Sequence, residues 1–365
     1  MIKLLIVDDS PLMRRLLTDI FTAEGDFEVA AARNGVEALG MLANFVPDVI
    51  TLDVYMPEMD GLTCLDRIMV LHPCPVVMVS ALTAEGAEET LEAMALGAVD
   101  FVPKPKGAVS LEIDKIAENL VDKVRVASKA RIPRTARLRE RVRAANAGVL
   151  PQPRKRPAKP GSGPMAPIAN LPRDTDGLVL VGCSTGGPPA LDALLGELPA
   201  DFPWPVLVAQ HMPASFTGPL ARRLDRLCAL EVREVDKTTP LLPGHAYIAQ
   251  GDADVILSRR AERLVALPAP ADPDLFWHPS VDRMVSSAMR MVAPERLVGV
   301  LMTGMGTDGA SAMATLKHRG GVTIAEAEST AVVWGMPGAL VARGGASRVS
   351  PLPEIAGELV KLLSR

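Results

Sequence analysis

Short apolar runs alternate with amphipathic stretches along the first third of the chain. Between residue 2 and about residue 125 there are five apolar runs, each followed by a stretch with apolar residues at helical spacing. In chain order the runs are KLLIV, EVAAA, DVITL, PVVMVSA and VDFVP. KLLIV, DVITL and PVVMV are largely apolar, as expected of parallel strands that helices cover on both faces. Five strands alternating with five helices predict a doubly wound α/β domain, with functional residues at the carboxyl ends of its strands.

A second α/β pattern starts at Gly177, after a segment of different composition. The segment 125–175 is rich in Arg, Lys, Pro, Ala and Gly, which favours a solvated linker over a basic docking site. Its first part, to about Asn146, could hold a basic amphipathic helical arm, whereas the prolines that follow are too dense for a helix. We therefore predict three parts: a domain over 1–124, a linker over 125–175, and a second α/β domain with a mainly parallel sheet over 176–365.

Composition excludes several classes of function. The net charge of -4 and a pI near 5.8 argue against nucleic acid as the main partner, because phosphate binding needs a surplus of Lys and Arg. The N-terminal run meets two aspartates almost at once, unlike a signal peptide, and no apolar run approaches the roughly 20 residues of a membrane span. We expect a cytoplasmic protein without membrane insertion. Its reduced thiols, which lack metal-ligand spacing, are Cys64, Cys74, Cys183 and Cys228.

Acidic and basic side chains follow the predicted strands of the first domain. Asp8 and Asp9 come directly after the first strand, and Asp53 ends the third. In an open parallel sheet these carboxylates meet at one edge, where their repulsion is relieved if they share a divalent cation such as Mg²⁺. Ser80 ends the fourth strand and Lys104 follows the fifth. The sequence therefore predicts a site that binds Mg²⁺ and a phosphoryl group.

These motifs resemble those of the response-regulator receiver domain in order and spacing: DD at 8 and 9, LDVYMPEMDGL around 53, VSAL at 80 and FVPKP at 104. The resemblance implies a flavodoxin-like (βα)5 fold and a phosphoacceptor, Asp53, that receives phosphate from a chemotaxis histidine kinase. It also implies that Lys104 pairs with the phosphate and that Ser80 senses it. The Mg²⁺ ligands that it implies are Asp8, Asp9, Asp53 and the backbone carbonyl of Tyr55.

In the second domain a glycine-rich turn, GCSTGG, follows a predicted strand and precedes a predicted helix. Such a turn exposes the hydroxyl of Ser184 and places it near helix N–H groups that can stabilise an oxyanion, but it can equally bind an anion without catalysis. His211 ends another strand run and Asp308 follows a third. A serine nucleophile needs an imidazole to take its proton and a carboxylate to orient that imidazole. We therefore predict a serine hydrolase site.

The segments GCSTGGPPAL, QHMPASFTGPLARRLD, LPGHAYIA, HPSVDRM and LMTGMGTDGA resemble, in this order, the catalytic domain of the chemotaxis methylesterase family. The resemblance implies that Ser184 is the nucleophile, His211 the general base and Asp308 its orienting carboxylate. Thr185 and the backbone N–H of Met305 are the implied orienting and oxyanion-stabilising groups, and no cofactor is implied for hydrolysis. The chain departs from the family pattern at Cys183, where alanine is usual, and in IAQGD, where proline is usual in place of the glutamine.

The family further implies phosphorylation-activated hydrolysis of glutamate γ-methyl esters on methyl-accepting chemoreceptors, with release of methanol, and deamidation of receptor glutamine as a second activity. We expect the unphosphorylated receiver to cover the hydrolase site and phosphorylation to open it. An alternative is a receiver protein whose output domain binds a partner or an anion without catalysis. A DNA-binding output is disfavoured because no helix-turn-helix pattern follows the linker.

Overall fold

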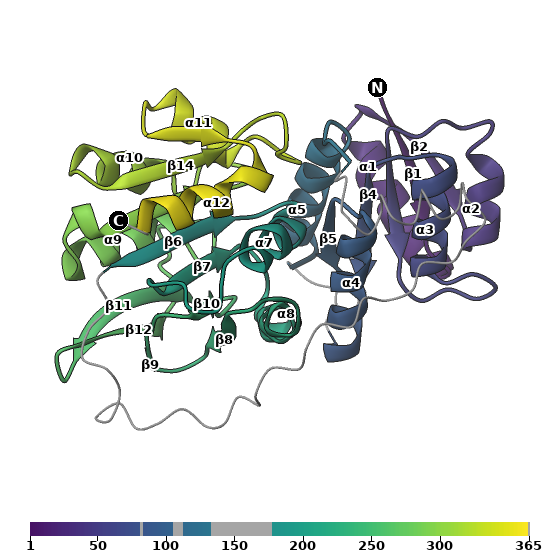
Figure 1. The fold of residues 1–365 in the computed structure, drawn as a ribbon. Helices are drawn as coiled ribbons and strands as arrows, with labels where there is room; N and C mark the ends of the chain where they lie inside the picture. Colours follow the sequence, from purple (N-terminus) through teal and green to yellow (C-terminus); the bar gives the residue numbers. More distant parts are fainter. Residues whose placement is uncertain (81–82, 105–111, 133–176, 364–365) are drawn as a thin grey trace. The chain divides into compact units, whose positions relative to one another are not determined.

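The computed structural model describes residues 1–80, 83–104, 112–132 and 177–363 and separates the chain into two compact units, Met1–Arg154 and Lys155–Arg365 (Figure 1). Each unit is considered by itself below. The basic arm and the proline-rich tether predicted within 125–175 lie outside the described residues from residue 133 onward. The domain boundaries at 124 and 176 therefore stay predictions.

The N-terminal unit is built on one parallel sheet of order β2-β1-β3-β4-β5. Its strands are β1 (Ile2–Val7), β2 (Phe27–Ala32), β3 (Val49–Asp53), β4 (Val76–Ser80) and β5 (Asp100–Pro103). Its helices are α1 (Pro11–Ala23), α2 (Gly35–Met41), α3 (Gly61–Leu71), α4 (Ala84–Leu96) and α5 (Glu112–Ala127). The predicted doubly wound α/β fold is confirmed.

Local sequence explains where these helices begin. Ser10, Asn34, Asp60 and Thr83 each accept a hydrogen bond from a backbone N–H in the first turn, which satisfies a donor that the helix cannot pair itself. The turn and helix start that Asp60 and Gly61 predict, as residues typical of a turn and a helix N-terminus, are thus confirmed. Helix α1 packs beside α5, whereas α2, α3 and α4 pack side by side. All residues of β3 and β4 are buried, as expected of strands covered on both faces.

The C-terminal unit contains a seven-stranded sheet of order β15-β14-β13-β6-β7-β10-β8, in which every neighbouring pair is parallel. Its strands are β6 (Leu178–Cys183), β7 (Val206–Gln210), β8 (Glu231–Val235), β10 (His245–Ala249), β13 (Leu297–Leu301), β14 (Val322–Glu326) and β15 (Arg348–Ser350). The predicted α/β fold with a mainly parallel sheet is confirmed.

A second, antiparallel sheet of order β11-β12-β9 lies in the same unit. It consists of β9 (Thr239–Pro240), β11 (Asp254–Arg260) and β12 (Arg263–Ala269). The apolar runs of the second domain, WPVLVAQ, HAYIA, ADVILS, RLVGVLM and GVTIA, predict β7, β10, β11, β13 and β14. They do not predict β8, β9, β12 or β15, and they do not distinguish the antiparallel β11 from the parallel strands. Hydrophobic runs do not mark β9 and β15, which are short, or β8, which reads EVREV. Strand β12 reads RLVALPA and is largely apolar, so its run was present in the sequence and was overlooked.

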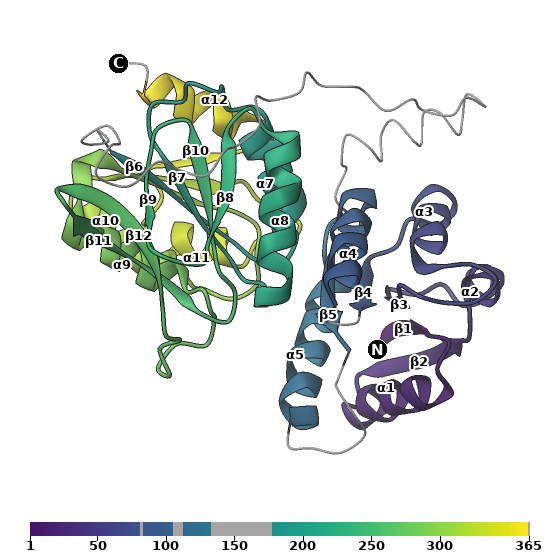
Figure 2. The same cartoon turned by 90° about the horizontal axis from the view of Figure 1, so that it is seen from below.

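Two groups of helices flank the parallel sheet of the C-terminal unit (Figures 1 and 2). Helices α7, α8 and α12 form one group, and α9, α10 and α11 form the other, with α9 also packing on β11. The helices are α7 (Gly187–Gly196), α8 (Ala214–Leu227), α9 (Val281–Met291), α10 (Ala310–His318), α11 (Met336–Ala342) and α12 (Leu352–Leu363), with a 3-10 turn at Pro294–Arg296. Within the described ranges, no helix is both long and apolar enough to cross a bilayer.

Candidate active and phosphoryl-binding sites

The predicted site residues gather where each parallel sheet reverses its direction of winding. In the N-terminal unit the chain leaves β1 toward one side and β3 toward the other, so the crevice at their carboxyl ends is a switch point. In the C-terminal unit the same reversal occurs between β6 and β13. Open α/β sheets bind ligands at such points because the two loops diverge and leave a crevice between them.

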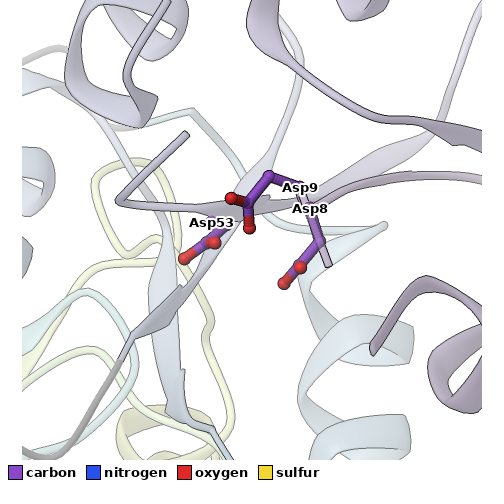
Figure 3. A group of neighbouring side chains, drawn as sticks. All are labelled: Asp8, Asp9 and Asp53. Atoms are coloured by element: carbon purple, nitrogen blue, oxygen red, sulfur yellow. The ribbon is translucent and has the colours of Figure 1, made fainter. Parts of the chain in front are cut away.

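Three carboxylates meet at the first switch point. One oxygen from each of Asp8, Asp9 and Asp53 lies within 4.8 Å of the others, and Figure 3 shows the three side chains at neighbouring strand ends. Asp8 and Asp53 are buried, whereas Asp9 is exposed. Burial raises the pKa of Asp53 to about 6, although the ammonium of Lys104 opposes the rise. The predicted clustering of these acids is what the structure has.

The other predicted residues of this site, Lys104, Tyr55 and Ser80, make different contacts near the three aspartates. Lys104 Nζ lies 2.7 Å from Asp53 Oδ2 and 3.0 Å from Asp8 Oδ2, so the ammonium bridges the two buried acids. Tyr55 supplies a backbone hydrogen bond to Asp53, while its side chain is about half exposed. The buried Ser80 hydroxyl donates to the Gly86 carbonyl at 3.2 Å, at the start of α4. Phosphate sensing by Ser80 stays a prediction.

The donors of this cluster fit a hard divalent cation. Carboxylate oxygens are the ligands that Mg²⁺ prefers, and three of them at this spacing offer a charge that a single ammonium does not balance. Gly61 shows how tightly the neighbouring turn is built, because a Cβ there would lie 2.1 Å from the Asp53 carbonyl oxygen. Asp8, Asp9 and Asp53 would hold the cation, which would supply positive charge beside an incoming phosphoryl group.

At the second switch point Ser184 follows β6 in a turn that glycine makes possible. Gly186 has φ of 76°, in the left-handed region that side chains rarely adopt. A Cβ on Gly187 would lie 1.8 Å from Gln210 Oε1, so any other residue there would force the Gln210 side chain to move. The Ser184 amide donates to the Thr303 carbonyl at 2.9 Å, which ties the turn to the loop after β13. Helix α7 then begins at Gly187, as the sequence predicted.

His211 and Asp308 form a buried pair beside this turn. His211 Nε2 lies 2.8 Å from Asp308 Oδ2, and the imidazole side chain is 2% exposed. The carboxylate fixes the proton on Nε2, which leaves Nδ1 as the basic nitrogen. Nδ1 is buried and has no hydrogen-bond partner among the described residues. It is therefore available to take a proton from a hydroxyl that approaches it.

Asp308 also lies at the N-terminus of α9. Its carboxylate accepts hydrogen bonds from the backbone N–H groups of Val281 (2.6 Å) and Asp282 (3.0 Å), and from the hydroxyl of Ser280 (3.0 Å). Burial alone would raise the pKa of Asp308, but these bonds and the one to His211 outweigh it and hold the pKa below its ordinary value. Asp308 therefore stays ionised and can stabilise a charged imidazole.

Gly304 brings the loop after β13 directly against Ser184. A Cβ on Gly304 would lie 2.8 Å from the Ser184 Cβ, so Met305, the next residue, is near the nucleophilic position. The Met305 N–H donates to no residue that the structure describes, which leaves it for an oxyanion. Thr185 is buried, and its carbonyl accepts from the Thr303 hydroxyl at 2.8 Å. These positions suit the predicted roles of Thr185 and Met305, which stay predictions.

Two residues around this site were not found from the sequence. Gln210 is buried and joins the two strand ends: its Nε2 donates to the carbonyls of Ser184 (3.1 Å) and His211 (3.0 Å), and its Oε1 accepts from the Cys183 thiol (3.0 Å). Trp277 stacks on His211 with ring centroids 4.9 Å apart. The available signals were that Gln210 directly precedes His211 and that Trp277 lies in the segment FWHPS. Neither residue type by itself predicts such a contact.

The other histidines and Cys183 have local roles. His278 Nδ1 lies 3.2 Å from the Asp254 carboxylate, and His245 Nδ1 lies 2.8 Å from the Pro243 carbonyl, so both make structural contacts. All four cysteines are free and buried. Burial raises the pKa of the Cys183 thiol far above its ordinary value, which leaves it unreactive. Cys183 is therefore a packing residue and not a second nucleophile.

We predict that Mg²⁺ stabilises the N-terminal unit and that Asp9→Asn weakens this effect, because the variant leaves two carboxylates where three share the cation. Each kcal/mol that bound Mg²⁺ adds to the free energy of unfolding should raise the melting temperature of a unit of this size by about 2–4 °C. Differential scanning calorimetry at millimolar Mg²⁺ measures the shift. Asp19→Asn, which alters an exposed acid on α1, should respond to Mg²⁺ like the unsubstituted chain; equal shifts in both variants would contradict the site.

Gln210→Met should slow the reaction of Ser184 with a fluorophosphonate probe about ten- to hundredfold, because small displacements of a nucleophile from its base are costly. Methionine has similar length but donates no hydrogen bond, so the two carbonyls lose their common partner. The rate of probe labelling, followed by mass spectrometry of the intact chain, reports nucleophile reactivity directly.

Gln250→Met makes the same substitution directly after β10, where the glutamine side chain has no hydrogen bond within the described residues, and should label at the normal rate. Melting temperatures of both variants separate a local displacement from general unfolding. If Gln210→Met is labelled as fast as the unsubstituted chain, Gln210 does not position the nucleophile.

Comparison with known proteins agrees with this geometry. The family model for the CheB methylesterase matches residues 179–359, and the model for the response regulator receiver domain matches residues 4–113. The catalytic domain of a Thermotoga maritima CheB methylesterase, a crystal structure, is 36% identical, covers 51% of this chain and 98% of its own, and superimposes with a TM-score of 0.50.

Curated relatives match over the whole chain. A protein-glutamate methylesterase/protein-glutamine glutaminase of Rhodospirillum rubrum is 56% identical over 100% of this chain and 97% of its own length. A protein of the same description from Rhodopseudomonas palustris is 56% identical over 99% of this chain and 98% of its own. The chain thus belongs to the CheB methylesterase family and carries a response regulator receiver domain at its N-terminus.

Proposed function

We propose that this protein hydrolyses γ-methyl esters of glutamate on methyl-accepting chemoreceptors in the cytoplasm, releasing methanol, and that phosphorylation of its receiver domain activates it. The observation that carries the proposal is the buried His211–Asp308 pair, whose unpartnered Nδ1 belongs to the same switch point as Ser184. A partner- or anion-binding output domain without catalysis would not need an oriented imidazole with a free basic nitrogen. Relatives that match over nearly the whole chain and are described as protein-glutamate methylesterases support an enzymatic function.

Acylation would begin with attack of Ser184 Oγ on the ester carbonyl carbon, while His211 Nδ1 takes the hydroxyl proton. The tetrahedral oxyanion would be stabilised by the Met305 N–H, with Thr185 orienting the turn. His211 would then give its proton to the leaving methoxide oxygen as the C–O bond breaks. Methanol departs, and the glutamyl group stays as an ester of Ser184.

Deacylation would repeat these steps with water. His211 Nδ1 takes a proton from water as the water oxygen attacks the acyl carbon, and His211 then gives that proton to Ser184 Oγ as the bond between the acyl carbon and Oγ breaks. The products are a free glutamate carboxylate and the original enzyme. A glutamine side chain would follow the same route and lose ammonia; this deamidation demands more of the proton donor, because an amide has the poorer leaving group.

The receiver site would supply the control. Asp53 would accept a phosphoryl group from a chemotaxis histidine kinase, with Mg²⁺ held by Asp8, Asp9, Asp53 and the Tyr55 carbonyl. Lys104, which already contacts Asp53, would pair with the phosphoryl oxygens, and Ser80 would turn from Gly86 toward them. Occlusion of the hydrolase by the unphosphorylated receiver is the simplest form of this control.

Ser184→Ala should reduce methanol release from methylated receptor membranes by at least about a thousandfold, because no other hydroxyl takes the place of the nucleophile. Gas chromatography of released methanol measures the rate. Ser311→Ala, a serine-to-alanine change on the exposed surface of α10, should leave the rate unchanged. Normal methanol release by Ser184→Ala would favour the non-catalytic alternative.

Asp53→Asn should remove the increase in methanol release that a small phosphodonor such as acetyl phosphate causes, while the rate without donor stays near that of the unsubstituted chain. The asparagine cannot form the acyl phosphate, yet it leaves the second unit intact. Rates are compared with and without donor at fixed Mg²⁺. Full activation of the variant would show that another group receives the phosphoryl group.

A further inference from the structure

One large aromatic side chain beside the hydrolase site is turned toward solvent. Phe276 is 79% exposed, and Val349 is 50% exposed; these are the large apolar side chains that stand exposed among the described residues of the C-terminal unit. A single exposed apolar residue is ordinary and by itself indicates nothing. What distinguishes Phe276 is its place next to the base and the way its segment is held.

Phe276 is connected to the base through one intervening ring. Its ring meets Trp277 edge to face, with centroids 4.8 Å apart and planes at 82°. Trp277 in turn stacks on His211, with centroids 4.9 Å apart and planes at 6°. A Cβ on Gly306 would lie 3.6 Å from Trp277 Nε1, so the indole also borders the loop that carries Met305. Phe276 therefore stands at the rim of the site, two ring contacts from the basic nitrogen.

The segment that carries Phe276 is fastened on both sides by one buried carboxylate. Asp254, whose side chain is 0% exposed, accepts from the Asp272 amide at 3.1 Å and from the Ser280 amide at 2.8 Å. It also pairs with Arg283 and His278. These bonds hold its pKa below the ordinary value against the opposing effect of burial. A segment fixed in this way presents its exposed ring with little entropy left to lose on binding.

We infer that Phe276 is a docking residue for the protein substrate, and that it contacts apolar side chains that neighbour the esterified glutamate. The inference rests on the proposed function. A glutamate side chain that reaches Ser184 brings its chain neighbours to the rim of the site, and on a helix the residues three and four positions away lie about 5–6 Å from it. An aromatic ring at the rim can bury itself against them. Trp277 supports both this ring and the imidazole.

Phe276→Ser in the full chain separates docking from chemistry. We expect kcat/KM for methanol release from methylated receptor membranes to fall at least about fivefold, through a higher KM, as for loss of an aromatic anchor. Hydrolysis of p-nitrophenyl acetate, which has no neighbouring side chains to dock, should stay within about twofold of normal. Phe276→Tyr keeps the ring and should keep receptor activity. Val349→Ser removes the other exposed apolar side chain and should match the unsubstituted chain.

Each contrary outcome has one meaning. If the unsubstituted chain releases no methanol from receptors, the proposed function fails. If it does so and Phe276→Ser is equally active, Phe276 does not dock the substrate. An equal loss toward p-nitrophenyl acetate would mean that Phe276 acts through Trp277 on His211. An equal loss in Val349→Ser would mean a general effect of removing an exposed apolar side chain. If Phe276→Ser changes the oligomeric state on size-exclusion chromatography, Phe276 contacts a second copy of this chain and not the substrate. Each of these outcomes overturns the inference.

Discussion

The carboxylate of Asp308 is the point on which the hydrolase site depends. It lies where the loop after β13 meets the first turn of α9, and it accepts two backbone N–H groups of that turn, the Ser280 hydroxyl and His211 Nε2. Burial opposes its charge, but the hydrogen bond and the charge interaction with His211, together with the two backbone N–H bonds, hold the pKa of Asp308 below its ordinary value. An ionised Asp308 fixes the imidazole tautomer and leaves Nδ1 as the basic nitrogen, as the proposed role of His211 requires. The geometry of this pair is thus a consequence of where α9 begins.

The small antiparallel sheet in turn fixes the position at which α9 begins. This sheet is an addition to the seven-stranded parallel sheet. Asp254 is the first residue of β11, and its carboxylate holds the Ser280 amide one residue before α9. Helix α9 packs along β11. Asp254 therefore links the extra sheet to Ser280, and Ser280 links it to Asp308. The parallel strands deliver the three predicted site residues, and the antiparallel strands hold the helix that orients one of them.

The sequence predicted the strands that form clear apolar runs and the site residues that stand at the ends of those runs. It did not predict residues whose role depends on side-chain contacts between distant segments. Asp8, Asp53, Ser184 and His211 could be placed because each stands at the end of an apolar run, and parallel strands bring such ends to one edge. The edge strand β8 was missed because EVREV exposes polar residues and shows no apolar run. Gln210 and Trp277 were missed for a different reason: their contacts join segments that only the folded chain brings together, and no spacing rule relates them.

The two sites differ in how completely their charged and polar groups are paired within the protein. The N-terminal cluster holds three acids against one ammonium, so it responds to any ion or phosphoryl group that alters this balance. The hydrolase site is held by contacts from within its own unit: Gln210 fixes the turn to the base, Thr303 fixes it to the neighbouring loop, and α9 fixes Asp308. Because a preorganised site pays no cost of rearrangement during reaction, its chemistry needs no assembly signal. Phe276 stands in solvent at the rim of this site, so the substrate recognition that we infer for it is separate from the Ser184, His211 and Asp308 arrangement.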